Sequence, residues 1–205
     1  MNTYQQEQLQ ALLAVRRMGD APFKKAVDGG FDLGMEIAGY MAFRVDVEAF
    51  FKKWFENTCT RNCYSSRLSA CCSKDGIITF WADVVINARY STEAALDRLE
   101  TAILHPENDH KCIYLAESGC LWRVKPIVCE MFLCDAAEKK VFTEHPSAQR
   151  QMREIEACKK TYTWPDRRVL FEVLEEIYMD AGCDSPLMYM HNSPGLRRLI
   201  KARKA

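Results

Sequence analysis

Residues 46–63 read DVEAFFKKWFENTCTRNC, and this stretch joins the clearest helical pattern in the chain to the first two of its clustered cysteines. The apolar side chains recur at the i, i+3, i+4, i+7, i+8 spacing of a helix with one face in the core: Val47, Phe50, Phe51, Trp54 and Phe55. Asp46 is placed to cap this helix, which we expect to end just before Cys59. The pattern therefore predicts a helix whose aromatic face positions Cys59 and Cys63 against the core.

Helical periodicity also dominates the sequence on both sides of this stretch. A capping-box pattern at Thr3 and Gln6 opens a first helix, and Gly19 is placed to end it. Thr79 favours a helix that starts at about Phe80. Further helices are expected over about residues 91–104 and 147–162, and from a cap near residue 163 or 166 to a stop at residue 182.

These patterns predict a mostly α fold, a helical single domain with irregular cysteine-rich metal-binding loops. A chain of 205 residues is long enough to bury a substantial core in one domain. We expect residues 59–134 to form a cysteine-cluster metal-binding core, with flanking helices in residues 1–58 and 135–205.

The cysteines are concentrated in the middle of the chain. Eight of the ten lie between residues 59 and 134, in two groups: Cys59, Cys63, Cys71 and Cys72, then Cys112, Cys120, Cys129 and Cys134. Such a concentration indicates a metal site or a disulfide framework. The N-terminus has no secretory pattern and no apolar run is long enough to cross a bilayer, so we expect a cytoplasmic protein with reduced thiols. That compartment favours metal over disulfides.

All eight clustered cysteines are therefore predicted metal ligands. Thiolates bind zinc, and they also bind iron in iron–sulfur clusters, and the spacing alone does not choose between the two. Eight thiolates suffice for two four-coordinate zinc ions, or for one cluster with four thiols left over. Neighbouring side chains diverge, so Cys71 and Cys72 either serve different metals, or one binds and the other packs. His110, two residues before Cys112, is a candidate mixed-site ligand, although a surface loop is the commoner setting for such a histidine.

The second cysteine group carries a distinctive motif. Residues 112–115 read CIYL and residues 119–134 read GCLWRVKPIVCEMFLC. This pattern resembles the second half of the zinc- or iron-chelating domain family, the YkgJ-type cysteine-cluster proteins. The first group, which ends in the Cys71-Cys72 doublet before an Ile-x-Thr helix start, matches in order. The resemblance covers about residues 59–134 and implies metal binding through these cysteines, and some relatives are linked to lysine N-methylation with an iron–sulfur cluster.

Other functional classes find little support in the sequence. The chain has no zinc-protease HExxH, no phosphate-binding loop, no dinucleotide fingerprint and no CxxC pair, so no catalytic residue is identified. Lys plus Arg and Asp plus Glu number 28 each, a balance that disfavours nucleic acid and membrane surfaces as partners. The exception is the basic segment of residues 197–204, which suits a solvated helix end or a contact with nucleic acid or an acidic partner.

Three functional hypotheses follow. The first is a metal-binding protein that chelates zinc or an iron–sulfur cluster. The second is an enzyme in which the metal or cluster supports modification of a protein or peptide. The third is a zinc-stapled module that binds a protein partner.

Overall fold

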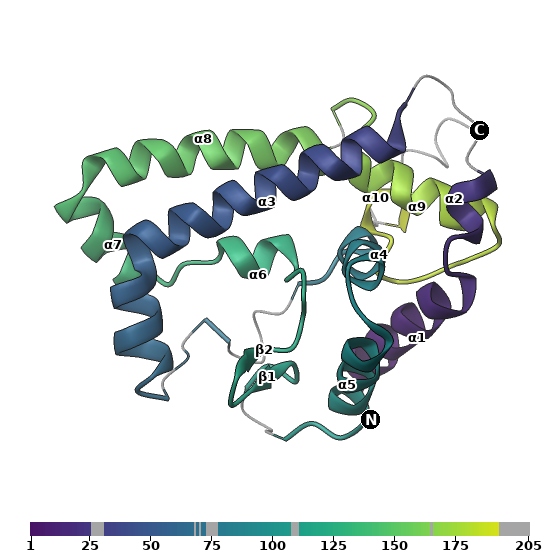
Figure 1. Cartoon of the computed structure of the whole chain (residues 1–205), viewed down its shortest axis with the longest axis horizontal. Helices are drawn as coiled ribbons and strands as arrows, with labels where there is room; N and C mark the ends of the chain where they lie inside the picture. The colour runs from purple at the N-terminus through teal and green to yellow at the C-terminus, as the bar shows by residue number, and fades with distance from the viewer. Residues whose placement is uncertain are drawn as a thin grey trace.

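The computed structural model describes residues 1–25, 31–67, 69, 71–72, 78–107, 111–164 and 166–192. Helices make up most of this part of the chain, as the sequence predicts (Figure 1). The elements, in order, are α1 (Thr3–Met18), α2 (Ala21–Lys25), α3 (Leu33–Phe55), the π-helix η1 (Glu56–Tyr64), α4 (Trp81–Arg89), α5 (Glu93–Leu104), β1 (Leu115–Ala116), β2 (Gly119–Cys120), α6 (Ile127–Met131), α7 (Asp135–Glu144), α8 (Pro146–Thr163), α9 (Leu170–Asp180) and α10 (Tyr189–Asn192).

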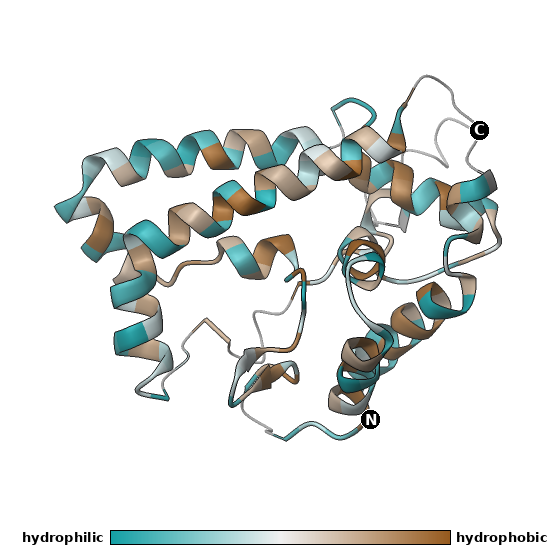
Figure 2. Ribbon diagram, viewed as in Figure 1, coloured by the Kyte–Doolittle hydropathy of each residue, from teal (hydrophilic) through white to brown (hydrophobic). Residues whose placement is uncertain are grey.

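Two long helices, α3 and α8, run side by side along one edge of the molecule (Figure 1). Aromatic contacts join them, since the Tyr162 ring lies 5.3 Å from that of Tyr40 and 5.7 Å from that of Phe43. Near the other end of the pair, the Trp54 indole N–H donates to the Gln151 amide oxygen at 2.9 Å. Figure 2 shows α8 as a largely hydrophilic ribbon, so this helix covers α3 from the solvent side.

The short helix α4 lies at the centre of the remaining helices, and all its residues from 81 to 87 are buried. It packs against α1 and α9, and its Trp81 ring lies 5.3 Å from that of Tyr178. The Asp83 carboxylate begins the helix by accepting a hydrogen bond from the Phe80 backbone N–H at 3.0 Å. A helix buried all round in this way anchors whatever is attached to its ends.

Helix α5 is fixed to α1 by polar contacts across the pair. The Arg16 guanidinium, on α1, reaches carboxylates of Glu93, Asp97 and Glu100 at 3.0, 2.7 and 2.6 Å. Nearer the N-terminus, the Gln5 side chain donates to the backbone oxygen of Ile103 at 2.8 Å. The buried apolar side chains of both helices join a hydrophobic core shared with α3, α4, α6, α7, α8, α9 and α10.

Several local predictions need correction. The helix expected from Asp46 is the second half of α3, which Asp32 caps, and Asp46 lies in its middle. The chain also stays helical past Phe55, since α3 continues into the wider π-helix η1, which contains Cys59 and Cys63. Thr79 does not cap α4, whose first turn is closed by Asp83 instead.

Some helix ends agree with the predictions and others differ from them. The first helix is capped by Asn2 with Gln5, one position before the predicted pair, while Gly19 ends it with φ +50°, as expected. Thr92 caps α5 and α8 covers the predicted segment. Helix α9 begins later than predicted, at Leu170. The second cysteine group, expected to be irregular, contains the β1–β2 hairpin and α6.

No described helix combines the length and hydropathy needed to cross a membrane.

Candidate metal-binding sites

The predicted cysteine ligands are distributed over several structural segments. Cys59 and Cys63 lie on η1, and Cys71 and Cys72 lie in the segment that follows it. Cys112 precedes the hairpin, Cys120 ends β2, Cys129 lies in α6 and Cys134 is the N-cap residue of α7. None of the eight is in a disulfide. His110 lies outside the described residues, as does the basic segment of residues 197–204.

Hydrogen bonds to backbone carbonyl oxygens join the segments of the two cysteine groups. The Cys112 N–H donates to the Cys72 carbonyl oxygen at 3.0 Å, so the second group starts directly beside the doublet. The Tyr64 hydroxyl, at the end of η1, donates to the Ala116 carbonyl oxygen in the hairpin at 3.3 Å. Figure 1 shows the hairpin and α6 beneath α3, on the side where η1 descends. Segments about 40 residues apart in sequence thus meet in one region.

The hairpin itself brings Cys112 and Cys120 together. Antiparallel pairing sets Leu115 opposite Cys120 and Ala116 opposite Gly119, and the Leu115 N–H also donates to the Cys112 carbonyl oxygen at 3.0 Å. Gly119 has φ +108°, a backbone conformation that side chains with a Cβ rarely adopt. The glycine of the predicted Gly-Cys motif therefore makes the tight turn that returns the chain to the doublet.

Helix α6, which carries Cys129, is fastened to α4 by buried polar groups. The Asp83 carboxylate accepts a hydrogen bond from the Ile127 N–H at 3.1 Å, at the first turn of α6. One turn further along α4, the Asn87 amide oxygen accepts from the Val124 N–H at 2.9 Å. Burial raises the pKa of Asp83 to about 6. These two side chains position the Lys125-Pro126-x-x-Cys129 motif relative to the core.

Two further charges lie under the same motif. The Arg44 guanidinium, on α3, donates to the Lys125 carbonyl oxygen at 2.7 Å. Its terminal nitrogen also lies 3.7 Å from the Glu130 carboxylate, which in turn lies 3.3 Å from the Lys125 ammonium group. The helix α6 is therefore held from both sides, by α3 and by α4.

Four thiols around η1 influence one another electrostatically. Burial, with the neighbouring thiols of Cys71, Cys134 and Cys63, raises the pKa of Cys59 to about 11. These four cysteines come from η1, the doublet and the N-terminus of α7. We call them set A: Cys59, Cys63, Cys71 and Cys134.

The remaining thiols form a second neighbourhood. Burial raises the pKa of Cys112 to about 11, with contributions from Cys120 and, across the boundary with set A, from Cys71. Burial also raises the pKa of Cys129 to about 12, with contributions from Cys112, Asp83 and Cys120. Burial also raises the pKa of Cys120. The pKa of Cys72 is raised by a hydrogen bond to Cys71, by burial, and by the nearby thiols of Cys112 and Cys120. We call these four cysteines set B: Cys72, Cys112, Cys120 and Cys129.

The doublet connects the two sets. A hydrogen bond with the Cys72 thiol lowers the pKa of Cys71, and the ammonium groups of Lys125 and Lys111 lower it further. Cys71 is exposed whereas Cys72 is half-buried. Once Cys71 has lost its proton, the Cys72 thiol can donate to the Cys71 thiolate, so the first thiolate of the pair forms more easily than the second.

The sulfurs are neighbours without being closed into a ligand shell. Within the part of the chain that the structure describes, no three cysteine sulfurs lie within 4.8 Å of one another.

Two hydroxyls that the sequence did not identify as site groups lie beside set B. The Tyr4 and Thr79 hydroxyl oxygens are buried, and among the described residues their only hydrogen-bonding neighbours are each other. Burial raises the pKa of Tyr4 most, the thiols of Cys112 and Cys129 raise it further, and the Thr79 hydroxyl lowers it. The Cys129 thiol also lies 3.9 Å from the carbonyl oxygen of Ile78, the residue before Thr79.

A different set of ligand atoms lies on α9 and α10. The side chains of Glu172, Glu176 and His191 offer oxygen and nitrogen atoms that all lie within 4.8 Å of one another. The sequence analysis did not identify this group. The i, i+4 glutamate pair is visible in the sequence, but its proximity to His191 depends on how α10 folds back onto α9.

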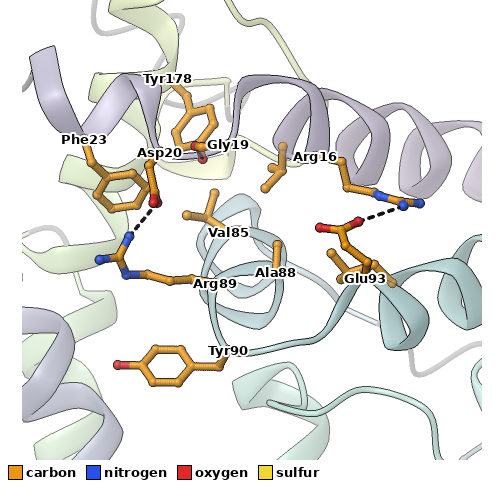
Figure 3. Close-up of a pocket in the computed structure, with 12 residues that line it drawn as sticks. Arg16, Gly19, Asp20, Phe23, Val85, Ala88, Arg89, Tyr90, Glu93 and Tyr178 are labelled. Carbon is orange, nitrogen blue, oxygen red and sulfur yellow. Dashed lines mark hydrogen bonds and ion pairs between the residues drawn. The ribbon is translucent and has the colours of Figure 1, made fainter.

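One cleft of about 490 Å³ lies between α1, α4 and α9, and its described lining contains no cysteine (Figure 3). Its two arginines are already paired, Arg89 with Asp20 at 2.7 Å and Arg16 with Glu93 at 3.0 Å. The Arg89 guanidinium also covers the Phe23 ring at 4.8 Å. The charged groups of this cleft therefore stabilise the packing of the helices around it.

Comparison with known proteins adds no assignment, because no protein-family model, curated protein or solved structure matches the chain. The resemblance to the zinc- or iron-chelating family stays a prediction from the motif of residues 59–134.

Proposed function

We propose that the protein binds metal through its eight clustered thiols, as two four-thiolate sites that meet at the Cys71-Cys72 doublet. Set A and set B each contain four cysteines, the number that a closed zinc site or an iron–sulfur cluster requires. The carrying observation is the convergence of five segments, namely η1, the doublet, the hairpin, α6 and the start of α7, fastened by the hydrogen bond from Cys112 N–H to the Cys72 carbonyl oxygen. The division also gives each member of the doublet its own metal.

The surroundings of the thiols suit bound thiolates. Lys111 and Lys125 supply positive charge beside Cys71, which offsets part of the negative charge that several thiolates accumulate. The buried hydroxyls of Tyr4 and Thr79, in the neighbourhood of Cys112 and Cys129, have only each other as partners, so one of their two O–H donors lacks an acceptor. A hydrogen bond from such a donor to a ligand sulfur orients the ligand and tunes the metal. Without metal, the unsatisfied O–H is buried at a cost of about 1–3 kcal/mol.

Zinc and iron–sulfur occupancy have different consequences at these sites. Zinc is redox-inert, so two closed thiolate sites would staple η1, the hairpin and α6 to the helical frame. An iron–sulfur centre would add electron transfer or redox sensing. Both require deprotonated thiols, and the raised pKa values of Cys59, Cys112 and Cys129 mean that binding releases protons at neutral pH.

Metal analysis of the full chain after anaerobic purification tests the proposal. We expect stoichiometric zinc in colourless protein, or iron with acid-labile sulfide and broad visible absorption. Cys59→Ser and Cys120→Ser, one in each set, should each remove about half of the metal, because each closed site needs all four thiolates. Cys158→Ser, outside both sets, is the matched control and should keep full occupancy. Protein that binds neither metal stoichiometrically, or variants that retain wild-type occupancy, would contradict the proposal.

A further inference from the structure

The Cys71-Cys72 doublet is the place where the two thiol sets meet. Cys71 is a neighbour of Cys59 in set A, whereas Cys72 is a neighbour of Cys112 and Cys120 in set B. The doublet is also the one pair among the eight clustered cysteines that is adjacent in the sequence. Because a closed site needs all four of its thiolates, one reaction that uses both doublet sulfurs would open both sites together.

The two thiols of the doublet are in contact and differ in their access to solvent. They form a hydrogen bond with each other, and Cys71 is exposed whereas Cys72 is half-buried. The ammonium groups of Lys111 and Lys125 lie beside Cys71 and favour its thiolate. An exposed thiolate beside positive charge is well placed to attack a disulfide, and the thiol next to it is then within reach of the mixed disulfide that results.

A disulfide between adjacent residues would be easily reversed. The Cα atoms of neighbouring residues are about 3.8 Å apart, closer than the roughly 4.4–6.8 Å that most disulfides span. Such a bond is strained, and strained or exposed disulfides are the ones that are readily reduced. A bond between Cys71 and Cys72 therefore suits a reversible modification better than a permanent crosslink.

We propose that the Cys71-Cys72 doublet is a redox switch that releases both metal ions together, an inference that rests on the proposed function. The oxidant is a small disulfide such as oxidised glutathione. The Cys71 thiolate attacks one of its sulfurs, so a mixed disulfide forms and one glutathione thiolate leaves. The Cys72 thiolate then attacks the Cys71 sulfur, and the second glutathione thiolate leaves. The two cysteine sulfurs lose two electrons, which the two glutathione sulfurs gain. Each set keeps three thiolates, so its metal site is no longer closed.

The full chain loaded with zinc tests the switch, because zinc is redox-inert and leaves the thiols as the groups that the oxidant changes. Oxidised glutathione is added, the released zinc is measured with a chromogenic chelator, and the disulfide is located by mass spectrometry of proteolytic fragments. We expect two zinc ions to leave for each disulfide formed, in one kinetic phase, with Cys71 linked to Cys72. A dithiol reductant and fresh zinc should then restore full occupancy.

A variant and its control separate the switch from general oxidation. Cys71→Ser keeps the four thiolates of set B, and its remaining zinc should leave at least roughly tenfold more slowly, because the exposed attacking thiolate is gone. Cys158→Ser, outside both sets, is the matched control and should release both zinc ions at the wild-type rate. Because Cys71→Ser also removes a ligand and can loosen the region, the zinc-to-disulfide ratio of the wild type is the second, independent measurement.

The outcomes distinguish this inference from the proposed function. Release of only one zinc ion per disulfide, a disulfide between other cysteines such as Cys112 and Cys120, or equally fast release from Cys71→Ser would overturn the switch, while the zinc content measured beforehand would still support the two metal sites. A chain that takes up fewer than two zinc ions also overturns the switch. A chain that holds neither zinc nor an iron–sulfur centre overturns the proposed function with it.

Discussion

Helix α4 and the π-helix η1 are of equal length, nine residues each, yet they are stabilised in opposite ways. In α4 seven consecutive residues are buried, and the helix contacts apolar side chains on most of its surface. In η1 no residue is fully buried, and the wide helical turn carries two thiols at the edge of the core. The contrast separates a helical frame, which apolar packing holds, from a cysteine region, which is held at a few points.

Some of those points are apolar, since Tyr114, Trp122, Ile127 and Met131 are buried in the shared core, and others are polar. The cysteine region contacts the frame through Asp83, Asn87 and Arg44, which hold α6 and the residues before it. Only some thiols, including Cys59 and Cys134, pack against the hydrophobic core. Burial of apolar area is the dominant stabilising contribution to folding, so the frame should be stable without metal. The cysteine region should gain much of its order from metal binding, because binding energy at such sites is also folding energy.

The largest expected effect is on the frame. Trp81→Ala removes a fully buried ring at the centre of the core, and we expect a loss of about 3–5 kcal/mol of unfolding free energy. The change should lower the midpoint of the whole unfolding transition, measured by circular dichroism with and without a chelator. Trp164→Ala, at a ring that is 57% exposed, is the control and should cost little. A local loss of structure at α4 with the rest of the helices intact would contradict a single cooperative frame.

The contact between the two regions should show a smaller and pH-dependent effect. Asp83→Asn keeps one acceptor oxygen and turns an amide NH2 toward the other of the two N–H groups, those of Phe80 and Ile127, and we expect a loss of about 1–3 kcal/mol. Burial raises the Asp83 pKa from 3.8 to about 6, so between these values the folded protein binds more protons than the unfolded chain. This contribution to stability is therefore present at low pH and is lost as the pH rises through about 6.

Stability curves of the wild type and the Asp83→Asn variant between about pH 5 and pH 8 measure that effect. Because the amide does not titrate, the advantage of the wild type should shrink by roughly 1 kcal/mol over this interval. Asn87→Ala, which removes the neighbouring hydrogen bond to Val124 without removing a titratable group, is the control. An advantage that grows with pH would show that the buried carboxylate is stabilised when ionised.

The same contrast explains what the sequence could predict. The helical spacing of Val47, Phe50 and Phe55 identified the buried face in the second half of α3, and Gly19 identified the end of α1, because both depend on neighbours within a few residues. The continuation of α3 into η1 was missed, since no local signal distinguishes a π-helical turn from a helix end. Thr79 had the residue type of a cap, but the helix begins one residue later, with Phe80 as the N-cap residue, and Asp83 closes the turn by accepting from the Phe80 N–H.

Contacts between residues far apart in the sequence were the part of the candidate site that was harder to predict. The cysteine spacing predicted that the two groups would meet, and the hydrogen bond between Cys112 and Cys72 agrees with that interpretation. The division into sets A and B depends on which way each side chain of the doublet points, which sequence spacing does not specify. Tyr4 is more than 100 residues from the thiols it approaches, and His191 reaches Glu176 only through the turn between α9 and α10. Tertiary packing determines such contacts, and the sequence contains no local pattern for them.

The smallest and most discriminating effect is expected at Tyr4. Tyr4→Phe removes a buried hydroxyl whose only partner in the absence of metal is the equally buried Thr79 hydroxyl, and it removes one unsatisfied donor with it, so the metal-free protein should be unchanged or slightly more stable. If the hydroxyl donates to a ligand thiolate of set B, the metal-loaded protein should instead lose about 1 kcal/mol, or roughly fivefold in metal affinity. Competition with a chelator measures the affinity, and Tyr90→Phe, at an exposed tyrosine, is the matched control. The two stability changes should differ in sign, and this difference matters more than their sizes. A hydroxyl that stabilises only the helical frame would change the metal-free and the metal-loaded protein alike. Equal shifts with and without metal would therefore assign Tyr4 to the frame.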